Sequence, residues 1–529
     1  NGNVIGGNCL HGSGPNGQGN VISGNNGPGI NIRHAGENVV SGNLIGTDRT
    51  GTVRMGNHDH GVFLWDAWEN RIGGAALGER NVISANYFYG VEMQRINARR
   101  NIVMGNMIGT DITGSVELSN VVTGVGLELK ASETLVANNL IVSTFGNCLI
   151  INDPGSSYNT VVGNRIGTDI TGTIPLSRSN FAGILMGQGS AYNRIGGTSP
   201  EDRNIISGNN TGIYFARQGQ HGNVVLGNYI GTDATGTKAC CNGSGIAVGP
   251  DRPMIGGMTP EERNIISGNQ QAGVSFCPGV DFAWIAGNYI GTDVTGSVPL
   301  GNGTGIGMEN NSRHCVQGNT VSGNDGIGIM LGPSSEYNSV LENLVGTDAT
   351  GSIAVPNSEG IDLFCGASHN EIVRNVISGN LGNGMRISSE WRGGEIDRST
   401  AFNWITGNRV GTDASGANSL PNHHNGIQFD FRAENNLVGG QSEADSNIIR
   451  FNQNNGIAFI LPHVRFNRIT RNTISSNESL GIAYEPNEDA VVVAPVITAV
   501  DRNYVRGTCV APDGSIVELF CGPDQEGET

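Results

Sequence analysis

Asn223–Gly236 reads NVVLGNYIGTDATG, and this stretch decides the fold of the chain. Its apolar residues alternate with others over only three to five positions before Gly-Asn or Gly-Thr-Asp interrupts the run. Alternation is the period of a β-strand, and glycine, asparagine and aspartate are turn residues. Strands this short cannot bury a face alone, so they must stack on copies of themselves.

The same stretch recurs along the whole chain. GTDxTG occurs seven times, the last copy with serine for the second threonine, and its aspartates are Asp48, Asp111, Asp169, Asp233, Asp293, Asp348 and Asp413. Successive aspartates are 63, 58, 64, 60, 55 and 65 residues apart. A module repeated at this interval is typical of a solenoid or an array.

Each module contains two further phrases, such as NIISGNNTGI at Asn204–Ile213 and GILMGQGSAYNRIGG at Gly183–Gly197. Each of the three phrases occupies about 20 residues, which predicts three turns in every module of about 60 residues. We therefore predict an all-β protein, a parallel β-helix over residues 1–485 with aliphatic ladders inside and asparagines at the corners.

Composition excludes several classes of protein. Glycine supplies 83 of 529 residues without a three-residue period, and isoleucine and valine are plentiful, so the chain is neither a collagen nor disordered. Charged residues are 15 % and the net charge is −17, with no basic face for nucleic acid. No apolar run approaches ~18 residues, so no membrane segment is expected. The nine cysteines form no CxxC pair, which disfavours zinc.

The phrases NVISGN, GNYIGTDATGT, GNGTGI and RIGG resemble those of bacterial right-handed parallel β-helix repeat proteins, which are mostly secreted or attached to the cell surface. The resemblance covers nearly all of residues 1–485. Residues 486–529 resemble the start of a small β-sandwich-like module, in which Cys509 and Cys521 flank a predicted hairpin and are the expected disulfide. The resemblance implies a right-handed rod outside the cytoplasm and no particular reaction, because one fold hosts many functions.

A search for catalytic groups finds no Asp-Asp pair, GHG or RxK of the polygalacturonase kind, so we predict no catalytic residue and no cofactor. His58, Asp59 and His60 in GNHDHG, and His423 and His424 in PNHHNG, are either metal ligands or polar loop residues. Neither cluster has a third ligand nearby in sequence, so we predict polar loops and no metal site.

Aromatic residues gather in FLWDAWEN (Phe63–Asn70) and NYFYG (Asn86–Gly90). Trp65, Trp68, Tyr87 and Tyr89 are candidates for an exposed shelf that stacks on sugar rings, with Asp66 or Glu92 bonding their hydroxyls. The alternative is that Phe63 and one tryptophan fill a widened corner of the rod.

The seven GTDxTG aspartates suggest a calcium ladder. At three turns per module they would lie about 14 Å apart, whereas calcium gathers six to eight oxygens at about 2.3–2.6 Å. We therefore predict that these aspartates form turns by accepting main-chain N–H bonds.

Seven near-equivalent modules favour a structural function, because a catalytic site needs one unique constellation. We predict a secreted or cell-surface rod for spacing, display, adhesion or assembly, with surface glycans or other copies of itself as partners. The alternative is a carbohydrate-binding or polysaccharide-active protein that uses the Trp65–Tyr89 region.

Overall fold

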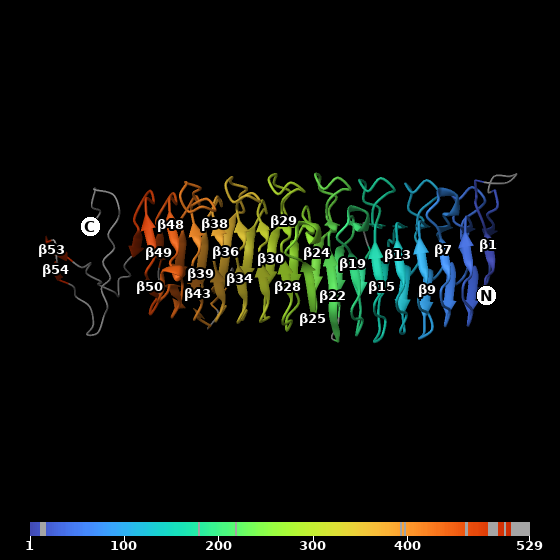
Figure 1. Ribbon diagram of the computed structural model, residues 1–529, viewed down its shortest axis with the longest axis horizontal. Coiled ribbons are helices and arrows are strands. Elements are labelled where there is room, and N and C mark those ends of the chain that lie inside the picture. The colour runs from blue at the N-terminus through green and yellow to red at the C-terminus, as the bar shows by residue number, and fades with distance from the viewer. Residues whose placement is uncertain are drawn as a thin grey trace.

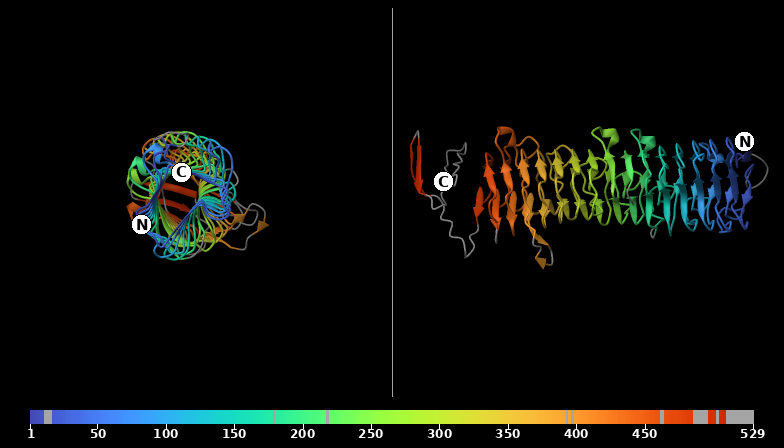
Figure 2. Two further views of the ribbon diagram at one scale, coloured as in Figure 1. Left: turned by 90° about the vertical axis from the view of Figure 1, so that its right-hand side faces the viewer. Right: turned by 90° about the horizontal axis from the view of Figure 1, so that it is seen from below.

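The computed structural model describes residues 1–10, 17–177, 180–216, 219–391, 394–395, 398–460, 464–484, 496–501 and 504–508. The chain is a right-handed parallel β-helix, and the predicted fold class is confirmed (Figure 1). Three sheets of 16 strands run along the rod, and every turn contributes one strand to each sheet. Seen along the axis, the three sheets enclose one interior (Figure 2).

Sheet A runs from β1 (Val4–Gly6) to β50 (Arg468–Thr470), and sheet B from β2 (Val21–Ile22) to β51 (Thr473–Ser475). Sheet C carries the sites described below. Its strands are β3 (Ile30–Arg33), β6 (Val62–Trp65), β9 (Tyr89–Gln94), β12 (Thr123–Glu128), β15 (Asn147–Ile151), β18 (Ala182–Met186), β21 (Thr211–Phe215), β24 (Ser244–Val248), β27 (Ala272–Phe276), β30 (Thr304–Met308), β33 (Ile327–Leu331), β36 (Glu359–Phe364), β39 (Met385–Ser388), β45 (Ile427–Asp430), β49 (Ile457–Ile460) and β52 (Ile482–Tyr484).

The helices of the described residues are short 3-10 turns at corners of the rod: Leu77–Glu79, Pro200–Asp202, Pro260–Glu262 and Glu443–Asp445. A hairpin of β40 (Glu390–Trp391) and β41 (Gly394–Glu395) follows β39 and projects from the rod (Figure 2). Among the residues that the structure describes, no helix is long and apolar enough to cross a membrane.

The length of one turn differs from the prediction. Register partners in sheet A are 30 residues apart from Arg194 to Val224 and 32 apart from Val39 to Arg71. A module of about 60 residues therefore makes two turns, and the predicted three turns of about 20 residues are wrong. The reason is that one turn contains one strand of each of the three sheets, so each phrase of about 20 residues holds two strands and not a whole turn.

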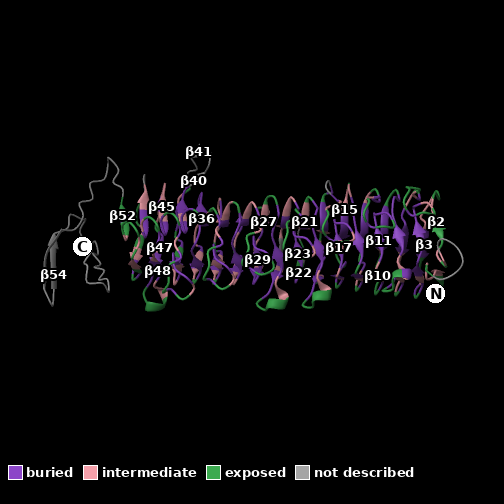
Figure 3. Ribbon diagram, turned by 90° about the horizontal axis from the view of Figure 1, so that it is seen from above, coloured by how far each residue is buried: buried purple, intermediate pink, exposed green. Residues whose placement is uncertain are grey.

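The interior is one continuous apolar core. Ile206, Ile230, Ile266 and Ile290 stack on one another in successive turns of sheet B, and none of them is exposed. The same cluster of buried residues extends from Ile30 to Ile457. Burial is concentrated on the strands and exposure on the corners (Figure 3).

Asparagines tie the turns together at the corners. Between sheets A and B the row is unbroken: Asn20, Asn43, Asn81, Asn106, Asn139, Asn164, Asn204, Asn228, Asn264, Asn288, Asn319, Asn343, Asn375, Asn408, Asn447 and Asn472. Each Oδ1 accepts the Nδ2 amide of the preceding member. Buried amides that bond one another in this way satisfy polar groups that would otherwise destabilise the core.

The GTDxTG loops of successive modules touch one another. The Ala234 N–H donates to Gly172 O at 2.9 Å, and the Val294 N–H donates to Gly236 O at 3.0 Å. Because a module has two turns, neighbouring aspartates are about 10 Å apart along the axis, and the expected 14 Å is wrong. The loops thus form one continuous row along the side of the rod.

Each of these aspartates is bound by its own loop. Asp233 Oδ1 accepts the main-chain N–H groups of Thr235 and Thr237 at 3.2 Å and of Lys238 at 3.3 Å, and the Thr235 hydroxyl at 2.8 Å. Asp48 Oδ1 accepts the N–H groups of Thr52 and Val53. In each loop Oδ1 of the aspartate accepts N–H groups of its own loop, which supports turn formation over calcium binding.

We expect Asp233→Ala to lower the free energy of unfolding by about 2 kcal/mol, because a charged acceptor of four hydrogen bonds is removed. Asp233→Asn, which keeps an acceptor oxygen, should cost less. Incubation with EDTA should leave the melting temperature of the unmodified chain unchanged. A drop in melting temperature on chelation would show that these loops hold calcium.

Two predictions concern residues outside the described part of the chain. The boundary at residues 485 and 486 and the Cys509–Cys521 disulfide both lie there. Of residues 486–529, the structure describes β53 (Val496–Asp501) and β54 (Tyr504–Thr508), which pair antiparallel with each other.

Candidate functional site

Ionisable side chains interrupt the repeat on the outer face of sheet C, in the turns of β6, β9 and β12. Side chains alternate along a strand, so Leu64 enters the core while Phe63 faces outward. Phe63 lies beside Glu92, and Glu92 beside Gly126. Gly126 leaves room for the Tyr89 ring, since a Cβ there would lie 2.8 Å from that ring.

His60 and Glu92 form a buried pair between aromatic rings. His60 Nε2 contacts Glu92 Oε2, and His60 Nδ1 lies 2.6 Å from Asp59 Oδ1. The imidazole stacks on Phe63 at 4.4 Å and on Tyr89 at 5.7 Å between ring centroids. His60 is 6 % exposed and Glu92 is 1 % exposed. Buried ionisable groups are costly unless paired, and they concentrate at functional sites.

A second carboxyl group, Glu128, lies next to this pair. Burial and then the hydrogen bond and charge of Glu92 raise the pKa of Glu128 to about 8. The Tyr89 hydroxyl donates to Glu128 Oε2 at 3.4 Å, and the Gln94 amide donates to Glu92 Oε1. Burial, Glu128 and Glu92 raise the pKa of the Tyr89 phenol as well. At neutral pH Glu128 is therefore largely protonated.

We expect Glu128→Gln to remove a loss of stability at alkaline pH. A carboxyl whose folded pKa is raised stabilises the fold below its unfolded pKa of 4.5, and this contribution is lost as pH rises through about 8. The melting temperature of the unmodified chain should fall between pH 6 and pH 9 by more than that of Glu128→Gln. Glu133→Gln, an exposed neighbour, is the control. Equal falls in all three proteins would contradict the raised pKa of Glu128.

The six predicted glycan residues do not form one exposed shelf. Tyr89 and Glu92 are buried in the cluster just described. Trp65 lies at the end of β6 with Arg95 4.5 Å and Arg33 5.8 Å from its ring. The guanidinium groups thus contact the tryptophan ring that sugars were expected to cover.

The other three residues lie at corners of the rod. Asp66 accepts the Asn97 N–H at 2.9 Å and lies 3.5 Å from His34. Trp68 packs on Gly36, where a Cβ would lie 2.4 Å from the indole nitrogen. Tyr87 is 57 % exposed and makes an edge contact with His58 at 4.9 Å. Tyr87 is thus the ring of the predicted set that is most open to a ligand.

Sequence reasoning missed Glu128 and the role of His60. Glu128 belongs to LELKASE, a stretch without aromatic residues, and its place beside Glu92 follows only from a register of 34 residues between Gly126 and Glu92. A correct turn length of about 30 residues is the signal that would have found the pair.

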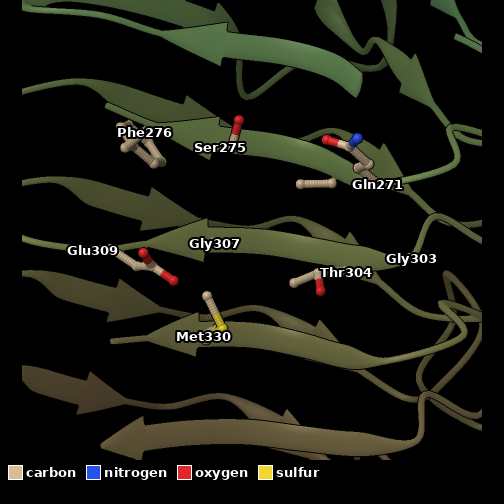
Figure 4. Close-up of a pocket in the computed structure, with 9 residues that line it drawn as sticks. Gln271, Ser275, Phe276, Gly303, Thr304, Gly307, Glu309 and Met330 are labelled. Carbon is tan, nitrogen blue, oxygen red and sulfur yellow. The ribbon is translucent and has the colours of Figure 1, made fainter. Parts of the chain in front are cut away.

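Farther along the same face, sheet C is hollowed between β27, β30 and β33 (Figure 4). The hollow has a volume of about 380 Å³ and exists because Ser275 and Gly307 are small at outward positions. Gln271, Thr304, Glu309 and Met330 surround it (Figure 4). No hydrogen bond within the described residues uses the hydroxyls of Ser275 and Thr304, so both are available to a ligand.

Within the described ranges, no three histidine, cysteine, aspartate or glutamate side chains converge in a way that could hold an ion. His58 faces Tyr87 instead, and the His423 and His424 N–H groups donate to Asn380 O and Gly382 O.

Comparison with known proteins gives one family match. The model of the family described as periplasmic copper-binding protein (NosD) matches residues 261–411 of the 529. No curated protein matches the chain significantly.

Solved structures with similar folds are remote. The A-module of a mannuronan C-5 epimerase from Azotobacter vinelandii is 10 % identical, with 82 % of this chain and 92 % of that chain covered and a TM-score of 0.33. A periplasmic alginate epimerase mutant is 13 % identical, with 78 % and 66 % covered and a TM-score of 0.31. The Dettilon tailspike protein is 14 % identical, with 71 % and 62 % covered and a TM-score of 0.37.

Proposed function

We propose that the chain is a rigid rod outside the cytoplasm, on the cell surface or in the periplasm, which spaces or displays what is joined to it. The unbroken asparagine row over all 16 turns carries this proposal. A single core and a single corner network make bending or sliding between turns costly, because every turn shares buried hydrogen bonds with both neighbours. The periplasmic description of the matching family and the secreted proteins that the repeats resemble support the location.

Deleting one module tests the rod. Removal of residues 234–293 joins Asp233 to Val294, which restores a GTDVTG loop in register. We expect a folded protein whose length falls by about 10 Å, as two turns of ~4.8 Å are lost. When the shortened protein is attached to a surface at one end and labelled at the other, the distance between the surface and the label should fall by the same amount.

Removal of residues 207–230, which make up one turn between Ile206 and Ile230, is the matched control. It brings the loops of Asp169 and Asp233 onto adjacent turns, so this variant should be unstable. Release of reducing or unsaturated ends from a polysaccharide by the full chain would contradict a purely structural function.

A second candidate function is carbohydrate binding on the outer face of sheet C. The hollow around Gly307 favours it, because hydroxyl, amide and carboxylate groups surround an apolar Met330 there, as sugar rings require. Glu309 favours a neutral glycan over a uronate. Copper binding is not part of either proposal, because the described residues hold no group of ligands for it.

Gly307→Leu and Gly307→Ala test this second function at one position. A Cβ at Gly307 meets only the Met330 methyl at 3.4 Å, so both variants should fold. Leucine should fill the hollow and abolish binding on an array of neutral glycans, while alanine should preserve it. Loss of binding in Trp65→Ala or Tyr87→Ala, with Gly307→Leu unaffected, would place the sugar at the β6–β9 cluster instead.

A further inference from the structure

Four consecutive turns carry an exposed apolar side chain at the corner between sheets B and C. We call these residues the apolar corner: Tyr87, Val121, Phe145 and Phe181. Each is at least 45 % exposed, and Phe145 reaches 73 %. In the other twelve of the 16 turns the same position holds a polar residue, glycine or, once, leucine: Asn26, His58, Asn210, Gly243, Gln270, Gly303, Asp325, Ser358, Leu381, His423, Gln453 and Glu478. Exposed apolar patches that depart from a repeat in this way mark interaction sites.

The strands that follow hold these four side chains in one line. Tyr89, Thr123, Asn147 and Ala182 are successive register partners in sheet C, and the residues of the apolar corner lie one or two positions before them. Neighbouring side chains are therefore one turn apart, about 4.8 Å, and the line is about 14 Å long. A line that the main chain has already ordered lowers the entropy cost of binding.

The aromatic rings of the apolar corner keep their faces open. Tyr87 meets His58 edge to face, and Phe181 meets Tyr214 edge to face at 5.4 Å between centroids. Within the described residues, no ring or guanidinium stacks flat on Tyr87, Phe145 or Phe181. The open faces are the part of an aromatic ring that an apolar ligand surface covers.

The corner between sheets C and A also exposes aromatic rings, but these rings cover one another. Tyr158 and Tyr192 are stacked at 5.3 Å between centroids with 6° between their planes. Tyr337 stacks on His369 at 4.9 Å, and His369 on Phe402 at 5.2 Å. Exposure alone therefore does not make a binding surface on this rod, and open ring faces distinguish the corner between sheets B and C.

We infer that the apolar corner binds a linear, neutral polysaccharide, such as a β-1,4-linked glucan or N-acetylglucosamine chain, which lies along the axis of the rod. Pyranose rings present apolar C–H faces that pack on aromatic rings. One sugar unit of an extended β-1,4-linked chain advances by nearly the rise of one turn, so successive turns meet successive units. The inference rests on the proposed carbohydrate binding for its class of ligand, but its site ends three turns before the hollow that begins at β27.

A polysaccharide fits this surface better than other macromolecules do. Seen along the axis, the corners are the outward bends of the coil (Figure 2). An amphipathic helix is recognised by a groove that encloses its apolar face, and an outward bend offers none. The net charge of −17 disfavours nucleic acid, an anionic lipid surface and a uronate polymer. A convex line of rings matches the flat face of an extended sugar chain.

Polar side chains stand at both ends of the line. His58 is exposed one turn before Tyr87, and Asn210 is exposed one turn after Phe181. The Asn210 N–H donates to Asn180 Oδ1 at 3.0 Å, which keeps this residue in register with the corner. An apolar surface with a few polar groups at its ends is the usual composition of a sugar site.

Depletion of the full chain from solution by insoluble β-1,4-glucan and by chitin tests the inference. The unmodified chain should bind both, equally well at low and high salt, because the contact contains no ion pair. Phe145→Ala and Phe181→Ala should each weaken binding about tenfold, as one stacked ring is lost. Phe145→Tyr, which keeps the ring, should bind as the unmodified chain does.

Two controls separate this site from the rest of the rod. Phe402→Ala removes an exposed ring that is stacked on His369, so it should not change binding. Gly307→Leu fills the hollow and should leave binding to the insoluble polymers intact, because short glycans do not span the line of rings. The changed phenylalanines are exposed, so circular dichroism should confirm that their variants fold.

The remaining outcomes decide against the inference. Polymer binding that is lost in Gly307→Leu but kept in Phe145→Ala and Phe181→Ala would overturn it and leave the hollow as the sugar site. Absence of depletion by either polymer, or an equal loss in Phe402→Ala, would overturn it as well. Self-association in place of polymer binding, abolished by Phe145→Ala, would show that a second copy covers the apolar corner.

Discussion

Asn228→Ala should destabilise the rod by about 4 kcal/mol, although it removes only one small side chain. Asn228 is fully buried in the unbroken row between sheets A and B. Its Nδ2 donates to Ile195 O and Leu226 O at 2.9 Å and to Asn264 Oδ1 at 3.1 Å. Its Oδ1 accepts the Asn204 Nδ2 group at 2.8 Å and the Asn204 N–H at 3.3 Å.

Alanine would leave these groups buried without partners, and each such group costs about 1–3 kcal/mol. The loss should appear in urea unfolding of the full chain as a lower midpoint. Asn210→Ala is the matched control, because Asn210 lies on the adjacent corner with its side chain exposed. It should change the free energy of unfolding by less than ~0.5 kcal/mol. Equal effects of the two substitutions would mean that the asparagine row adds nothing to stability.

The fold class could be predicted because its cause is local. Alternating aliphatic residues interrupted by Gly-Asn dictate short strands, and short strands dictate stacking. The length of a turn could not be predicted in the same way. NVISGN and NVVLGN look like equivalent phrases, yet one precedes a sheet C strand and the other a sheet B strand of the same coil. Only the pairing of each strand with its neighbours one turn away shows to which sheet each phrase belongs.

The aromatic region, too, could be predicted from the sequence only in part. The sequence singled out the turns of β6 and β9 because tryptophan and tyrosine depart from the repeat, and an ionisable cluster lies in those turns. It did not show which rings face water: Tyr89 and Glu92 are buried by their contacts with His60, while the corner exposes Tyr87.

One interruption of the asparagine pattern has a large consequence for acid stability. His314 occupies an asparagine position at the corner between sheets C and A and is 1 % exposed. Its Nδ1 accepts the Ala283 N–H at 3.1 Å, its own N–H donates to Asn338 Oδ1 at 3.0 Å, and its ring lies 4.3 Å from that of Phe276. Burial lowers the pKa of His314 to about 4, because the charged imidazolium would lose its hydration there.

The direction of the pH effect follows from this shift. The unfolded chain binds a proton at His314 near pH 6.5, and the folded chain does so only near pH 4. Acid therefore favours the unfolded state, and stability should fall by about 3 kcal/mol between pH 7 and pH 4. His314→Asn restores an amide that accepts the same Ala283 N–H without titrating, so its free energy of unfolding should lack this fall. The exposed His221, changed to asparagine, should leave the fall intact. If His314→Asn loses stability in acid as steeply as the unmodified chain, the carboxylates of the loops, and not this histidine, set the acid limit of the rod.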